Sequence, residues 1–177
     1  MNRWTAVVSV ALASVLLLGG CGKGPSKADA IRFNDALVDT NDRIAKAGSA
    51  FAEAAAAAVG GGIIEVGKVK REFENLSDAV GRSMADVRTL KVPETPAAKA
   101  FYSEHQALLK KQELIVKEDC RMILKALEDS LLTPQQRMAK IRPIASYLDS
   151  LDRDEVSGVK RAQAAFAKEQ GFELKKK

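Results

Sequence analysis

The sequence contains one histidine, His105, which is the side chain best suited to acid–base chemistry near neutral pH. A serine or cysteine hydrolase needs a base beside its nucleophile, so any such triad would depend on His105 alone. The sequence contains no glycine-rich phosphate loop, no G-x-S-x-G motif and no H-E-x-x-H motif. We therefore expect a protein that is not an enzyme.

Two interpretations of His105 stay open. It precedes Leu108 by three positions and Leu109 by four, at the border of an apolar helical stripe, and Gln112 follows one heptad later. In the first interpretation His105 and Gln112 form a buried polar layer that fixes helix register. The candidate partners in that layer are Asn34, Asn41 and Asn75.

In the second interpretation His105 ligates haem iron or lines a small-molecule pocket inside a helical bundle. The candidate ligands opposite it are Met84, Met122 and Met138. The sequence has no C-x-x-C-H motif for covalent haem attachment. This alternative function is a sensor or carrier.

Metal sites are not indicated by the acidic residues. A di-metal bundle needs Glu on two helices and Glu-x-x-His on the other two, and only the segment 104–106 has related residues. The acidic run Asp149–Glu155 lacks the ligand register and the glycine of a calcium loop. We expect no metal and no cofactor.

The N-terminal segment has the three parts of a secretory signal. Arg3 precedes an uncharged apolar run over residues 4–18, and Gly19 and Gly20 follow it. A membrane-spanning helix needs roughly 20 apolar residues, which is more than this run provides. We therefore expect residues 1–20 to be a cleaved signal peptide.

The segment Leu18–Cys21, LGGC, resembles the lipobox of bacterial lipoproteins. The resemblance implies cleavage between Gly20 and Cys21, a diacylglyceryl group on the Cys21 thiol, and acylation of the new amino group with a fatty acid such as palmitate. It also implies a location in the bacterial cell envelope. Because Gly22 rather than Asp follows the cysteine, the chain is similar to lipoproteins sent to the outer membrane, facing the periplasm.

The charge pattern favours an ordinary solvated surface. The chain has 28 Lys and Arg against 23 Asp and Glu, with both signs interspersed, and aromatic residues make up only 5%. A nucleic-acid-binding face would gather its cations and interleave aromatic side chains. We expect no nucleic-acid partner. The expected partners are the membrane, through the lipid anchor, and an envelope protein or peptidoglycan.

Cys120 is the second cysteine, and it has no partner in the chain if Cys21 is lipidated. It shares an apolar helical face with Val116, Ile123 and Leu127, where a free cysteine behaves as a small hydrophobic residue. A reactive thiol or an intermolecular disulfide is the alternative.

The rest of the chain shows apolar residues at helical steps of three and four. One stripe runs from Ala30 to Ala58, a second from Val66 to Leu90, a third from Phe101 to near Glu128, and a fourth from Met138 to Phe166. The third stripe repeats at steps of seven: Phe101, Leu108, Ile115 and Met122, with Tyr102, Leu109, Val116 and Ile123 beside them.

Helix boundaries are indicated by capping residues. Thr95–Pro96 and Thr133–Pro134 with Gln136 are start signals, Gly60–Gly62 and Gly171 are stop signals, and Pro143 should kink the last helix or shift its start. We expect an all-α fold, an antiparallel up-down four-helix bundle over residues 31–172. A lipidated cysteine and tether over 21–30 precede it, and a basic tail over 173–177 follows it.

Overall fold

The structure is a computed structural model that describes residues 25–59 and 66–174, without the side chains of residues 150–156. The predicted signal peptide, Cys21 with its cleavage site, and the glycines at 60–62 lie outside the described residues. The last three lysines of the predicted basic tail, at 175–177, also lie outside them.

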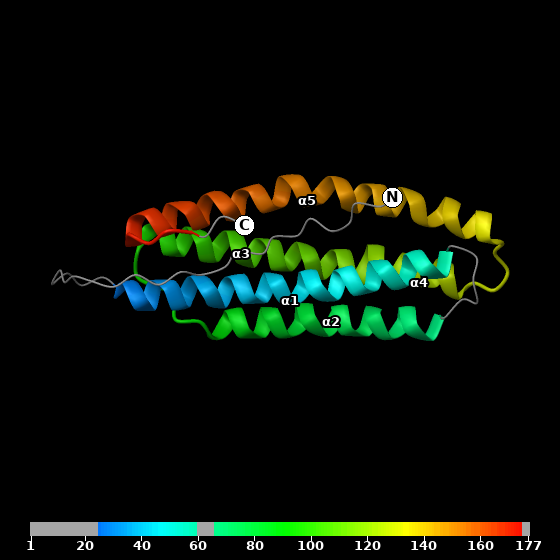
Figure 1. The fold of residues 1–177 in the computed structure, drawn as a ribbon, viewed down its shortest axis with the longest axis horizontal. Coiled ribbons are helices and arrows are strands. Elements are labelled where there is room, and N and C mark those ends of the chain that lie inside the picture. The colour runs from blue at the N-terminus through cyan, green and yellow to red at the C-terminus, as the bar shows by residue number, and fades with distance from the viewer. Residues whose placement is uncertain (1–24, 60–65, 175–177) are drawn as a thin grey trace.

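Every regular element among the described residues is helical, which confirms the all-α expectation. The elements are α1 (Lys27–Val59), α2 (Val66–Thr89), α3 (Pro96–Ile115), the π-helical turn η1 (Val116–Cys120), α4 (Arg121–Glu128) and α5 (Pro134–Gln170). In Figure 1, α1, α2, α3 and α5 lie side by side along the long axis of the molecule. The predicted third helix is divided by η1, so five α-helices are described where four were expected.

The predicted start signals of α3 and α5 are confirmed. The side chain of Thr95 accepts a hydrogen bond from the backbone N–H of Ala98, and proline occupies the first turn of α3. At α5, Thr133 and Gln136 form a capping box in which each side chain accepts from the other residue's backbone N–H. Gly171 ends α5 in the left-handed conformation, with φ of 67°, which glycine adopts without the steric cost of a Cβ atom.

The tether was predicted over residues 21–30, and its predicted C-terminal boundary lies too far along the chain. Helix α1 already begins at Lys27. The Ser26 hydroxyl accepts from the backbone N–H of Asp29 at 3.1 Å, which satisfies one of the free donors at a helix start. Ala30 is completely buried. Residues 27–30 therefore belong to the folded domain, because their backbone is capped and their apolar face is packed.

The predicted stripes of the first two helices face the interior. Side chains from α1 and α2 contribute Phe33, Leu37, Ile44, Phe51, Val69, Leu76, Val80 and Val87 to the core. Near the C-terminal end of α1, the rings of Phe51 and Phe73 lie 6.1 Å apart. The Arg121 guanidinium of α4 lies over the Phe73 ring. The helical periodicity of the sequence thus identified the buried faces of α1 and α2 correctly.

Of the two step-of-seven rows predicted in the third helix, the row through Phe101 and Leu108 fails after Ile115, whereas Leu109, Val116 and Ile123 of the second row are all buried. Met122 is 49% exposed, whereas its neighbour Ile123 is buried together with Val116 and Cys120. The reason is η1, since a π-helical turn contains one residue more than the corresponding α-helical turn. The inward-facing position therefore moves one residue along the chain beyond this turn.

Met138 was also predicted to face the core, and it is 45% exposed. Its neighbour Arg137 is buried instead and donates from Nη2 to the backbone oxygen of Asp129 at 2.9 Å. This contact fastens the turn between α4 and α5. Helix α5 then continues through Pro143 without a break, so the predicted shift of its start does not occur.

An aromatic cluster joins three helices at one end of the molecule. The ring of Phe33 on α1 lies 6.2 Å from Phe101 on α3 and 5.5 Å from Phe166 on α5. Phe172, just beyond α5, lies 5.7 Å from Phe166. Both Phe101 and Phe166 are almost completely buried, so this cluster fixes the start of α1, the start of α3 and the end of α5 to one another.

Candidate functional site

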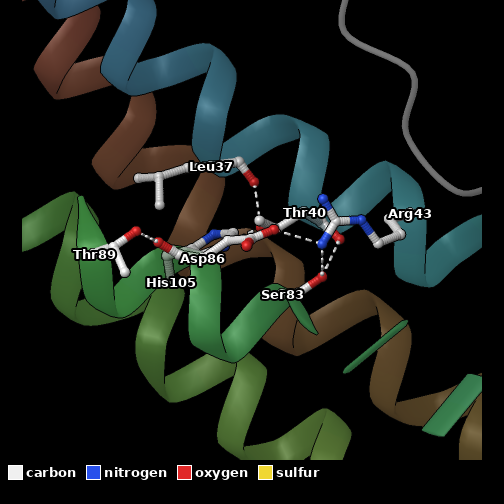
Figure 2. Close-up of polar contacts among 7 residues, drawn as sticks. All are labelled: Leu37, Thr40, Arg43, Ser83, Asp86, Thr89 and His105. Carbon is white, nitrogen blue, oxygen red and sulfur yellow. Dashed lines mark hydrogen bonds and ion pairs between the residues drawn. The ribbon is translucent and has the colours of Figure 1, made fainter. Parts of the chain in front are cut away.

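His105 lies on α3 in the centre of the fold, and its side chain has no exposed surface. Its Nε2 atom lies 2.8 Å from the hydroxyl oxygen of Thr40 on α1, as Figure 2 shows. The Thr40 hydroxyl donates its single proton to the backbone oxygen of Leu37 at 2.7 Å. Thr40 therefore accepts the second bond, and Nε2 of His105 is the protonated nitrogen.

The other ring nitrogen of His105, Nδ1, is consequently an acceptor. It is buried and has no hydrogen-bond partner among the described residues. Burial lowers the pKa of His105 from 6.5 to about 4, because a charged imidazolium would lose its hydration inside the protein. His105 is thus a neutral hydrogen-bond donor at neutral pH, not a proton acceptor accessible to a substrate.

The polar layer continues from Thr40 to α2. The hydroxyl of Ser83, which is fully buried, donates to the backbone oxygen of Thr40 at 3.3 Å. Arg43 of α1 donates to Asp86 of α2 at 2.7 Å and approaches the Ser83 hydroxyl at 3.5 Å. We call Thr40, Arg43, Ser83, Asp86 and His105 the central polar layer (Figure 2). It joins α1, α2 and α3 and runs from the core to the surface.

The Arg43–Asp86 ion pair closes the central polar layer at the solvent. The two side chains are 39% and 55% exposed, so water screens their attraction, and such pairs contribute about 0–1 kcal/mol. The buried hydroxyl and imidazole contacts contribute more to stability than this ion pair. Leaving a polar atom unpaired costs more free energy in the interior than at the surface.

A second buried polar contact joins α1 to α5. The side-chain amide of Gln163 donates to the side-chain oxygen of Asn34 at 2.8 Å, and both residues are buried. This contact crosses between segments that are far apart in the sequence, and it fixes the rotation of α5 against α1.

The interpretation of His105 as part of a buried polar layer was right, but the partners predicted for it were wrong. His105 contacts Thr40, while Asn34 bonds to Gln163 and Asn75 bonds to Glu72. Gln112 has a buried side-chain oxygen without a partner among the described residues. Sequence reasoning missed Thr40 and Ser83, although both stand at core positions of apolar stripes, and that placement is the signal that could have identified them.

The candidate haem ligands are spread over different environments. Met122 and Met138 are about half exposed, and Met84 is partly buried against the core. Nε2 of His105 is already engaged by Thr40. In the described part of the chain no three His, Cys, Asp or Glu side chains are grouped so that they could hold a metal ion.

Cys120 lies in η1 and is only 4% exposed. Burial, with a further contribution from the neighbouring Asp119, raises the pKa of its thiol to about 12. The thiol is therefore protonated at neutral pH, and a protonated, buried thiol is a poor nucleophile. This environment agrees with the interpretation of Cys120 as a small hydrophobic residue.

Together these features define an all-helical protein whose buried polar groups join helices rather than present reactive atoms to solvent. None of the described helices combines the length and apolar character required to span a membrane. Comparisons with protein-family models, with curated proteins and with solved structures find no significant match. The proposal for function therefore depends on the residues of this chain.

Proposed function

We propose that this protein is a lipid-anchored lipoprotein of the bacterial cell envelope, at the outer membrane and facing the periplasm, whose helical domain acts by binding an envelope protein or peptidoglycan. One observation carries the proposal: LGGC at Leu18–Cys21 follows a positively charged start and an apolar run. The lipid replaces a membrane span and keeps the domain at high local concentration near its partners.

We further propose that the domain is an antiparallel, up-down four-helix bundle. In this arrangement α3, η1 and α4 act as one rod beside α1, α2 and α5. The buried contacts of Asn34 with Gln163 and of Thr40 with His105 and Ser83 support it, because they join the rods in pairs across the interior. Such bundles present helix faces on their outside.

Binding is a better fit than catalysis because of where the reactive side chains lie. His105 is buried and neutral, and Cys120 is buried and protonated. The exposed helix faces carry mixed charges with a few large apolar side chains, among them Leu114 and Met122. Helix faces of this kind recognise partners through side chains spaced along one surface.

The first experiment is mass spectrometry of the N-terminal peptide of the protein purified from bacterial envelopes. We expect a chain that begins at Cys21 and carries diacylglyceryl and acyl groups. A Cys21→Ser variant should keep residues 1–20 and lack the lipid. A native chain that retains the signal or has an unmodified Cys21 would contradict the proposal.

Cross-linking in intact envelopes then tests the binding function. We expect a reproducible cross-linked partner for the native protein and its loss for Cys21→Ser, because the variant lacks the lipid that would carry the domain to the outer membrane. An acylated native chain that yields no partner, and no bound peptidoglycan, would contradict a binding role.

A further inference from the structure

The distance between the lipid and the folded domain is short. Helix α1 begins at Lys27, so only residues 22–26 separate it from Cys21. An extended chain spans at most about 3.5 Å per residue, which limits this connection to roughly 20 Å. Helix α5 has 37 residues and is about 55 Å long at 1.5 Å per residue. A lipid on Cys21, which is the proposed function above, therefore holds one end of the domain near the bilayer.

Four helix termini meet at that end, which we call the anchor end: the starts of α1 and α3 and the ends of α2 and α5. The Tyr102 hydroxyl donates to the backbone oxygen of Val87 at 3.2 Å, which joins α3 to the end of α2. The Thr95 hydroxyl donates to Glu169 at 2.9 Å, which joins the start of α3 to the end of α5. Figure 1 shows these termini together.

The anchor end presents four exposed cations: Lys27, Arg88, Lys91 and Lys168. Within the described part of the chain none of them has a hydrogen bond or an ion pair through its side chain.

The acidic side chains nearby are largely engaged. Asp29 contacts Ser26 and Arg32, Glu94 contacts Lys99 at 2.6 Å, and Glu169 accepts from Thr95. Glu173 is the remaining exposed acid, and the sequence continues with lysines at 175–177. Glu169 accepts from a neutral hydroxyl and so keeps its negative charge, as Glu173 does. The four cations outnumber these two acids, so the net charge at this end is positive.

We infer that the anchor end docks on the anionic headgroups of the bilayer through Lys27, Arg88, Lys91 and Lys168. The domain then stands on the membrane with its long axis pointing away from it. A cation close to an anionic membrane surface strengthens association about fivefold. The turn after α4, which contains Leu131, becomes the part of the domain farthest from the lipid.

The opposite end provides a matched control. Lys68, Lys70, Lys125 and Lys140 are exposed there and also have no ion pair within the described part of the chain. Electrostatic attraction decays over about 8 Å at physiological salt, which is far less than the length of α5. These four lysines therefore contribute nothing to docking when the domain stands upright, although their number and charge are the same.

The experiment uses the mature, acylated protein with a Leu131→Cys substitution labelled with a donor fluorophore, in vesicles that contain a rhodamine-labelled lipid. Cys120 is buried and leaves Leu131→Cys as the labelled site. The vesicles are phosphatidylcholine alone or equal amounts of phosphatidylglycerol and phosphatidylcholine. We expect weak energy transfer in the anionic vesicles, and a roughly twofold increase in neutral vesicles or at high salt, because the domain then tilts.

Reversing the four anchor-end cations to glutamate should raise transfer in anionic vesicles, and reversing the four control lysines should not. Circular dichroism verifies that both variants keep their helices, and the comparison of vesicles and salt needs no charge-reversal variant. If the chain is acylated and energy transfer does not change with lipid charge, with salt or with either set of substitutions, this inference alone is overturned. A chain without lipid on Cys21 overturns the proposed function as well.

Discussion

The hydroxyl oxygen of Thr40 on α1 lies 2.8 Å from Nε2 of His105 on α3, while the proton of the same hydroxyl goes to the backbone oxygen of Leu37. One side chain thus satisfies a carbonyl of its own helix and a donor of another helix. Buried polar contacts of this kind need a single alignment of their helices, whereas apolar contacts tolerate small slips. The pair therefore gives the interior a specific register, and it can be tested by substitution.

Thr40→Val should destabilise the protein by about 1–3 kcal/mol, because the buried Nε2–H of His105 loses its acceptor. The measurement is urea unfolding at neutral pH. Thr89→Val is the matched control, since the Thr89 hydroxyl also donates to a backbone oxygen of its own helix but is exposed. The control should change the free energy of unfolding by less than about 0.5 kcal/mol. Equal effects of the two substitutions would contradict a special role for Thr40.

Acid should unfold the protein partly through His105. Its pKa is about 4 in the folded protein and 6.5 ordinarily, so the unfolded chain binds the proton more tightly. The free energy of unfolding is then highest above pH 6.5 and falls toward pH 4, by up to about 3 kcal/mol from this residue.

The comparison that isolates this effect is His105→Gln, which keeps a donor near Thr40 and does not titrate. We expect urea unfolding at a series of pH values to show a smaller acid loss in the variant than in the native protein. The same loss in both proteins would mean that carboxyl groups alone cause the acid sensitivity.

The aromatic cluster should contribute strongly to stability. Phe166 is fully buried against Phe33, Phe101 and Phe172, and Phe166→Ala should cost about 3–5 kcal/mol through lost burial and the cavity it leaves. Leu131→Ala is the control, because Leu131 is 90% exposed and its truncation should be nearly neutral. Chemical denaturation of both variants checks the difference, and a small effect of Phe166→Ala would contradict the packing described.

Cys120 should resist thiol reagents in the native protein. Its burial and its raised pKa of about 12 predict labelling only after denaturation, because the thiolate is the reactive form. A Leu131→Cys variant supplies an exposed thiol for comparison and should be labelled at once. Rapid labelling of Cys120 in native conditions would favour the alternative interpretation as a reactive thiol.

The helix boundaries were predictable from sequence because they depend on local chemistry. The hydroxyls of Thr95 and Thr133 and the flexibility of Gly171 act within one turn of their own positions. The same is true of the stripes in α1 and α2, which follow helical geometry directly. The early start of α1 was missed because the contact between Ser26 and Asp29 was not considered.

The central polar layer was only half predictable. The sequence places His105 at the edge of a stripe, but which residue meets it depends on how α1 and α3 are aligned in space. That alignment comes from packing over the whole interior, so Thr40 could not be chosen over the asparagines by spacing alone. Met122 was wrongly predicted to be buried for a related reason, because no local residue pattern indicated the π-helical turn before it.

The π-helical turn has a consequence for how this chain tolerates changes in length. Val116–Cys120 contains one residue more than an α-helix requires, yet Leu108 before it and Ile123 after it both face inward. Removing one residue there would bring Ile123 onto the heptad that passes through Phe101 and Leu108. The π-helical turn thus accommodates one inserted residue without disturbing the core. Deleting one residue from this turn would leave a continuous α-helix that keeps its buried face.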